Sequence, residues 1–254
     1  MPLAFFCNDS YLIMKTIIFI IITLLSGAIA GTILGLINQV IVEPFVDEAI
    51  EIETQIMISE GEIIDRQEVN NLRLWQKEGE IVAGTILGTS IGALFGLVFV
   101  YTRSSLPGSN DKKKGIILAG VMFFVLFLIP ALKYPGNPPA VGDPETIVYR
   151  QSLYIGMLAI SGFSALGLAL LYRTTKQKES TKVIIPIIYA GIIAIAFIIL
   201  PPNPDDITIS KDLVMNFRIV STLTMGIFWG ILGIALGSFW DKIKPHETAK
   251  IATI

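Results

Sequence analysis

The stretch that decides the fold is TIIFIIITLLSGAIAGTILGLINQVIV, residues 16–42. It contains no charged side chain. A bilayer core about 30 Å thick requires about 20 residues of helix, and this run is longer than that. It is also too long for the apolar part of a cleaved signal peptide. Residues 16–42 therefore predict a helix that crosses a membrane.

Five further runs resemble the first one. They contain no Asp, Glu or Lys, and their single arginine is Arg218, near the start of the last run. The whole chain is 53% hydrophobic and 16% charged, whereas a soluble domain carries about 25% charged residues. The sequence thus predicts an all-α membrane helix bundle, one transmembrane domain over 1–254. The five further spans are 81–101, 115–132, 152–172, 183–200 and 215–239.

Charge differs between alternate loops. Twelve basic and five acidic residues lie in 1–15, 102–114, 173–182 and 240–254, and the other side, with Arg218 counted on it, carries seven basic and sixteen acidic ones. The positive-inside rule places the basic side in the cytoplasm. We therefore expect a multi-pass plasma-membrane protein with both termini cytoplasmic and three outward-pointing helical hairpins. Residues 1–15 would be an N-terminal extension, with Met14 an alternative start, and 240–254 a cytoplasmic tail.

Glycines recur every four residues in three of the spans, which places them on one helix face. In lipid, small residues allow close approach of helix backbones. This pattern predicts that spans one, two and six pack tightly against protein, and a pore lined by small residues is the alternative. The glycines are Gly27, Gly31 and Gly35; Gly84, Gly88, Gly92 and Gly96; and the pairs Gly226–Gly230 and Gly233–Gly237.

The second and third hairpins resemble each other. Pro135-Gly-Asn-Pro138 follows one short span and Pro201-Pro-Asn-Pro204 follows another. An acid, an arginine and a glycine-rich span come after each turn, so we predict parallel repeats. Asn203 and Pro204 would then match Asn137 and Pro138, and Arg218 would match Arg150.

The loop 133–151 is expected to be external and stiff, because proline fixes φ and removes a hydrogen-bond donor. Asp143 is predicted to cap the helix that starts at Pro144, with Arg150 as a structural partner. Lys133 ends span three, where its stem can lie along apolar surface. Two interpretations stay open: a lid shaped by the prolines, or a mouth whose carbonyls and carboxylates meet a cation. The loop residues singled out are Lys133, Tyr134, Pro135, Asn137, Pro138, Asp143, Glu145 and Arg150.

The loop 43–79 is acidic. Glu43, Asp47 and Glu51 follow i, i+4, i+8 spacing and share a helix face, where like charges repel. A bound cation would relieve the repulsion, and a solvated helix face is the alternative. Cys7 and His246 are single, so this chain alone cannot form a Cys/His metal cluster. No catalytic set or nucleotide-binding motif is present, which predicts a non-enzyme whose active transport would need a partner or an ion gradient.

Residues 132–147, LKYPGNPPAVGDPETI, with Arg150 and Tyr154, closely resemble the signature loop of the CbtA family. More loosely, the resemblance extends over most of the chain. It implies a probable cobalt transporter subunit with Co²⁺ as transported ion and no resident cofactor. It also implies a small histidine-rich membrane partner, CbtB, beside the lipid bilayer, and no nucleic acid.

Two functions are compatible with this sequence. The first is a permease subunit for a divalent transition metal, with cobalt uptake expected. The second is a non-transporting accessory subunit of a larger membrane complex, which fits the lack of charge inside the spans. For the first, the predicted metal-binding residues are Asp143, Glu145, Asn137, Glu43 and Asp47.

Overall fold

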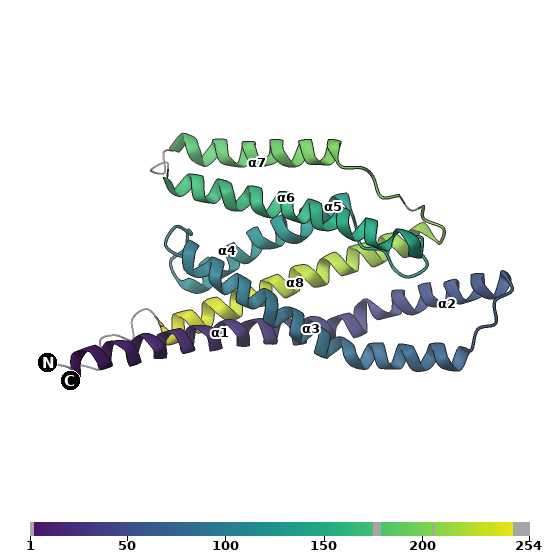
Figure 1. The fold of residues 1–254 in the computed structure, drawn as a ribbon, viewed down its shortest axis with the longest axis horizontal. Coiled ribbons are helices and arrows are strands. Elements are labelled where there is room, and N and C mark those ends of the chain that lie inside the picture. Colours follow the sequence, from purple (N-terminus) through teal and green to yellow (C-terminus); the bar gives the residue numbers. More distant parts are fainter. Residues whose placement is uncertain (1–2, 175–178, 205, 246–254) are drawn as a thin grey trace. The chain divides into compact units, whose positions relative to one another are not determined.

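The computed structural model describes residues 3–174, 179–204 and 206–245, and side chains for 16–172, 183–204 and 206–245. His246 and the basic side chains predicted for 173–182 lie outside these ranges. In the described residues every regular element is a helix and there are no strands (Figure 1). The elements are α1 (Leu3–Ile41), α2 (Glu43–Ser59), α3 (Arg66–Thr102), α4 (Asp111–Phe123), η1 (Phe124–Leu128), α5 (Ile129–Lys133), η2 (Pro144–Thr146), α6 (Ile147–Thr174), α7 (Glu179–Ile199) and α8 (Lys211–Ile243).

Five helical segments are long and apolar enough to cross a membrane. The fifth predicted run is also helical, but its apolar part, Val183–Ile199, is shorter than the other five. The predicted all-α class is therefore confirmed, with five long apolar helices and one short one. The hairpin and repeat arrangement stays a prediction. The five long segments are Thr16–Ile41, Arg66–Thr102, Asp111–Lys133, Pro144–Tyr172 and Lys211–Ile243.

The segment Asp111–Lys133 contains a one-turn π-helix, η1, just before Pro130. Proline has no N–H and its ring crowds the preceding turn of the helix. The π-helical turn is wider than an α-helical one, and it leaves backbone carbonyls that other groups must satisfy. Here Ser161 Oγ donates to Val125 O at 2.6 Å. Ser161 Oγ also lies 2.7 Å from Tyr189 Oη. Since its one proton is used on Val125, Tyr189 is the donor to Ser161.

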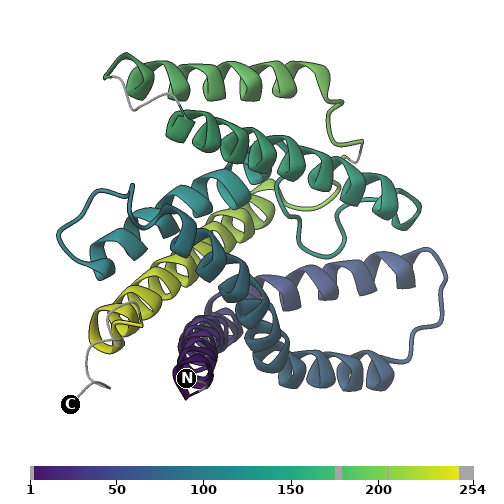
Figure 2. The same cartoon turned by 60° about the vertical axis from the view of Figure 1, so that its left-hand side comes forward.

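The chain divides into two compact units, residues 1–43, 65–121 and 223–254, and residues 44–64 and 122–222. In the first unit α1 and α3 cross in direct backbone contact (Figures 1 and 2). A Cβ placed on Gly92 would come within 2.7 Å of Gly27 Cα, and one on Gly84 within 2.7 Å of Gly31 O. Gly88 lies between Gly27 and Gly31 with no room for a side chain.

The predicted role of the glycines is thus confirmed for spans one and two. In α8, Gly233 and Gly237 lie against α4, where a Cβ on Gly237 would be 2.6 Å from Lys112 Cα. Gly230 has nothing within 4 Å, so the glycine face of α8 contacts α4 only in its C-terminal half.

Aromatic side chains connect α3 with α8 in the same unit. The rings of Phe95 and Trp229 are 6.3 Å apart, and those of Phe99 and Trp240 are 5.2 Å apart, both edge to face. Phe95 and Phe99 are fully buried. Large rings therefore fill the space beside the glycine contact, where they contribute packing beyond area burial.

The second unit has two apolar clusters. The first joins α5, α6 and α7, and α6 and α7 lie side by side in both views (Figures 1 and 2). The second joins α2 to the Pro-rich loop and the start of α8, through Ala49, Val141 and Leu213 with their neighbours. The buried face of α2 thus holds the loop that the sequence singled out.

Replacing Gly88 with Leu should lower the thermal stability of the purified protein. The added side chain would overlap Gly27 O and Gly31 Cα, so the helices must separate, and overpacking costs about 1–3 kcal/mol or more. Gly120→Leu is the matched control, because no atom lies within 4 Å of that Cβ position. An unchanged melting temperature for Gly88→Leu would contradict the packing role.

Candidate functional site

The Pro-rich loop is held at its N-terminal end by two hydrogen bonds within the second unit. Tyr134 Oη donates to Pro201 O at 2.6 Å, and Lys133 Nζ donates to Phe197 O at 2.9 Å. Burial raises the pKa of the Tyr134 phenol, so it stays neutral and keeps its donor. The two Pro-containing turns, at Pro135–Pro138 and Pro201–Pro204, are therefore bonded together through Tyr134.

Arg218 of α8 reaches the middle of this loop. Its Nη2 and Nε donate to Asn137 Oδ1 at 2.6 and 3.2 Å. Pro138 beside it is fully buried, and Thr208 Oγ1 donates to Ala140 O at 3.1 Å. Long-range contacts thus hold the loop, in addition to the restriction that its prolines place on the backbone.

Asp143 is a helix cap, as predicted. Its side chain accepts from Glu145 N at 2.8 Å and starts the single 3₁₀ turn that leads into α6. Arg150 donates to Thr146 Oγ1 at 3.1 Å and to Asp143 O at 3.2 Å. These contacts fix the turn and leave the Asp143 and Glu145 side chains exposed.

The five predicted metal-binding residues differ in their surroundings. Asn137 Oδ1 faces a guanidinium, which would repel a cation, and Glu43 is ion-paired with Arg73. Asp47 is exposed on α2. In the described part of the chain, no group of three or more His, Cys, Asp or Glu side chains could hold a metal. Metal binding by any of the five stays a prediction.

A second polar group lies where the α1–α3 contact ends, which we call the α1–α3 polar cluster. It comprises Asn38 and Gln39 of α1, Glu43 at the start of α2, and Arg73, Lys77 and Glu80 of α3. Gln39 Nε2 donates to Lys77 O at 2.6 Å, and Glu43 pairs with Arg73. Asn38 makes a side-chain hydrogen bond with Glu80.

Glu43 is the one member of this cluster among the metal-binding residues predicted from the sequence, although the sequence holds a signal for the others. Glu80 continues the four-residue spacing of Gly84, Gly88, Gly92 and Gly96 backwards by one step. On α1, Gln39 likewise follows Gly35 by four residues. The glycine stripes therefore lead directly into the polar cluster on both helices.

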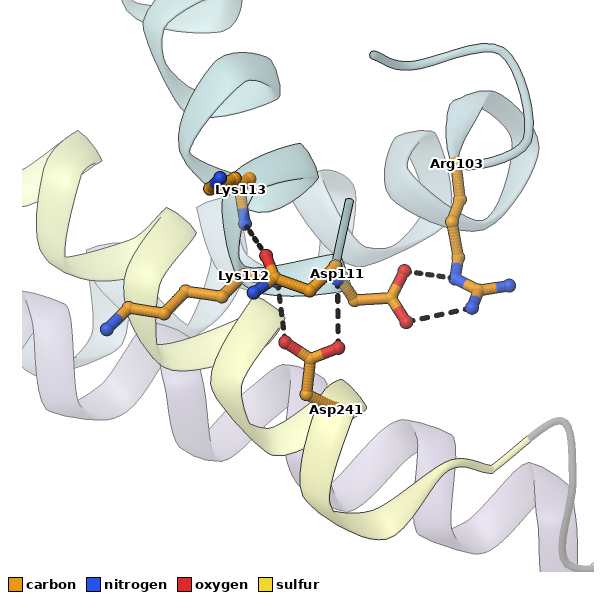
Figure 3. Close-up of polar contacts among 6 residues, drawn as sticks. Arg103, Asp111, Lys112, Lys113 and Asp241 are labelled. Atoms are coloured by element: carbon orange, nitrogen blue, oxygen red, sulfur yellow. Dashed lines mark hydrogen bonds and ion pairs between the residues drawn. The ribbon is translucent and has the colours of Figure 1, made fainter. Parts of the chain in front are cut away.

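A third polar group holds the opposite end of the first unit (Figure 3). Asp241 of α8 accepts from Asp111 N and Lys112 N at 2.8 and 3.0 Å, so it caps α4 from another helix. Arg103 binds both oxygens of Asp111 at 2.5 and 2.8 Å and lies over the Trp240 ring at 5.7 Å. The ends of α3 and α8 and the start of α4 thus meet, as they must if these loops share one membrane side.

Comparison with protein families gives one match, over residues 16–241, to the family described as "Probable cobalt transporter subunit (CbtA)". The chain belongs to the CbtA family. The matched segment includes the Pro-rich loop, the α1–α3 polar cluster and Asp241, so all three polar groups are within the CbtA region. No curated protein and no solved structure matches this chain.

Replacing Asp241 with Ala in this CbtA protein should lower its stability by about 0.5–2 kcal/mol, the usual cost of losing a helix cap. Asp241→Asn keeps one acceptor oxygen and should lose less. Lys242→Ala, one residue along and exposed, is the control. Chemical unfolding in detergent measures the three variants, and equal effects of Asp241→Ala and Lys242→Ala would contradict capping across helices.

Proposed function

We propose that this protein is a plasma-membrane permease subunit that takes up a divalent transition-metal cation, with Co²⁺ as the substrate. The observation that carries the proposal is membership of a family described as a probable cobalt transporter subunit, over residues 16–241. The apolar helices provide the membrane location that such a role requires. A transporter subunit needs no catalytic residues, and we infer that the protein is not an enzyme.

The Pro-rich loop supports the proposal through its geometry. Its backbone is fixed by Tyr134, Arg218 and the Asp143 cap, whereas the Asp143 and Glu145 carboxylates point to the exposed surface. Because the loop backbone is already ordered, a cation that binds these carboxylates causes little further loss of conformational entropy. We propose that they collect the cation at the outer surface, and that Asp47 and the other external acids raise its local concentration.

The proposed partner is a small histidine-rich membrane protein of the CbtB type. This chain has one histidine and one cysteine, and oxygen ligands alone discriminate weakly between Co²⁺ and other divalent ions. Nitrogen ligands from a partner would supply the missing selectivity. The lipid bilayer is the other surrounding that the apolar helices require.

The second candidate is an accessory subunit without a transport path of its own. It is favoured by the lack of a three-residue metal-binding group in the described ranges. Purified protein that stays folded in liposomes but passes no Co²⁺, with or without a histidine-rich partner, would support this candidate over the first.

The double variant Asp143→Asn with Glu145→Gln should weaken Co²⁺ uptake. Asn keeps the capping oxygen, so the loop stays folded while two negative charges are lost. We expect the half-saturating Co²⁺ concentration to rise about tenfold, on the scale of losing a partner in a metal site. Uptake of radioactive cobalt into proteoliposomes measures this.

The matched control is Glu60→Gln with Glu62→Gln, which removes the same charge from exposed positions of the other acidic loop. Uptake in this control should fall less than in the Asp143→Asn, Glu145→Gln variant, because acids of the 43–79 loop only raise the local cation concentration. Equal loss in both double variants would assign the effect to general surface charge and not to the Pro-rich loop.

The proposed orientation predicts a labelling pattern. In a Cys7→Ser background, single cysteines at Glu62 and Glu145 should react with an impermeant maleimide added to intact cells. A cysteine at Ser109, in the basic loop 102–114, should react only after the membrane is opened. The reverse pattern would overturn the orientation and with it the role of the acidic loops.

A further inference from the structure

Asn38 and Glu80 face each other at the outer end of the glycine contact. A Cβ on Gly35 would lie 2.8 Å from Ile81 Cα and 3.2 Å from Glu80 O, so the backbones of α1 and α3 are still touching here. Glu80 is the residue immediately before the predicted second span, 81–101. A carboxyl group at such a boundary is costly unless its oxygens are satisfied.

Two oxygens of this pair have no hydrogen-bond partner. Asn38 Oδ1 and Glu80 Oε2 are both buried and accept no hydrogen bond from any described residue. The side-chain hydrogen bond between the two residues therefore runs from Asn38 Nδ2 to Glu80 Oε1. A buried acceptor that accepts no hydrogen bond destabilises the fold, because it has lost its bonds to water.

The nearby charges do not satisfy these oxygens. Arg73 donates to Glu43 and, through Nη1, to Gln76 Oε1 at 2.6 Å. Arg73, Lys77 and the like-charged Glu43 are the charged groups that act on Glu80. The facing side chains of α1, Asn38 and Gln39, are neutral.

We propose that Glu80 is a proton-binding site of the membrane domain, where the acid and the Asn38 amide form a pair with two hydrogen bonds. The Oε2–H donates to Asn38 Oδ1, while Asn38 Nδ2 donates to Oε1. One proton thus satisfies both orphan oxygens at once. When the proton leaves, it passes to water and Glu80 becomes a carboxylate that keeps only the Asn38 Nδ2 bond.

A divalent metal is a weaker explanation of the same two oxygens. No third His, Cys, Asp or Glu completes a metal-binding group around Glu80 among the residues described. Arg73 and Lys77 lie on the same helix as Glu80. Their positive charges would repel a divalent metal ion. A proton needs one acceptor and one donor site, and the pair provides both.

The consequence for transport rests on the proposed function. The chain has no nucleotide-binding motif, so uptake against a gradient must draw on another source of free energy. A carboxyl group that exchanges a proton at the outer end of two tightly packed helices can link cation movement to the proton gradient. Glu80 would be the coupling residue, distinct from the carboxylates that collect the cation.

Proton binding can be tested by thermal unfolding at different pH values, without a transport assay. The folded protein binds this proton more tightly than the unfolded chain, so its stability should fall as pH rises. Glu80→Gln replaces the acid by an amide that can still make two hydrogen bonds with Asn38. Its melting temperature should therefore exceed that of the unmodified protein at high pH, and the fall with pH should be smaller.

Glu78→Gln is the matched control, because Glu78 is exposed two residues away on the same helix. It should keep the pH dependence of the unmodified protein. Infrared difference spectra provide a second readout: the C=O band of a protonated carboxyl should be lost in Glu80→Gln and kept in Glu78→Gln. An unchanged pH dependence together with an unchanged C=O band in Glu80→Gln would overturn the proposal.

Co²⁺ uptake into proteoliposomes with and without an imposed pH gradient then tests coupling. We expect the gradient to accelerate uptake severalfold in the unmodified protein and in Glu78→Gln, and to have no effect in Glu80→Gln. If all three proteins fail to take up Co²⁺ while the stability and infrared results hold, the proposed function fails and the proton site stands. Equal acceleration of uptake in all three proteins would show that Glu80 does not couple uptake to the proton gradient.

Discussion

The backbone contact between α1 and α3 is the constraint on which the first unit depends. Membrane helices gain nothing from the hydrophobic effect when they associate, so they need close packing and hydrogen bonds across the interface. Gly27, Gly31 and Gly88 supply the first, because each lies where a Cβ would overlap backbone of the other helix. Thr32 and Thr85 supply the second with a hydroxyl contact of 2.8 Å. The register of the two helices is therefore fixed along their whole crossing.

That register also determines which polar residues meet where the crossing ends. Because Gly35 packs against Ile81, Asn38 lies next to Glu80 and Gln39 lies next to Lys77. These buried groups form hydrogen bonds with one another, but Asn38 Oδ1 and Glu80 Oε2 have no hydrogen-bond partner. A tightly fixed interface thus ends in an incompletely satisfied pair, and this is where a protein can place a titrating group without loosening its packing.

In the second unit an irregular Pro-rich loop is held beside apolar helices. Its prolines remove donors and stiffen the chain, but carbonyls still need partners. Tyr134, Lys133 and Arg218 supply donors to Pro201, Phe197 and Asn137. The side chains that look most like cation ligands in the sequence therefore divide into two kinds. Asn137 is used internally, whereas Asp143 and Glu145 remain at the surface.

The sequence by itself determined where the helices lie, that they are apolar, which faces carry glycine, and that Asp143 caps a helix, because these follow from local composition and spacing. Periodicity reports the face that a residue occupies, but not the helix that it meets. That Asn137 binds Arg218, that Asp241 caps α4 from 130 residues away, and that Glu80 faces Asn38 were decided by the tertiary structure alone. Each depends on the register between segments distant in the chain, which close backbone packing sets and no local pattern encodes.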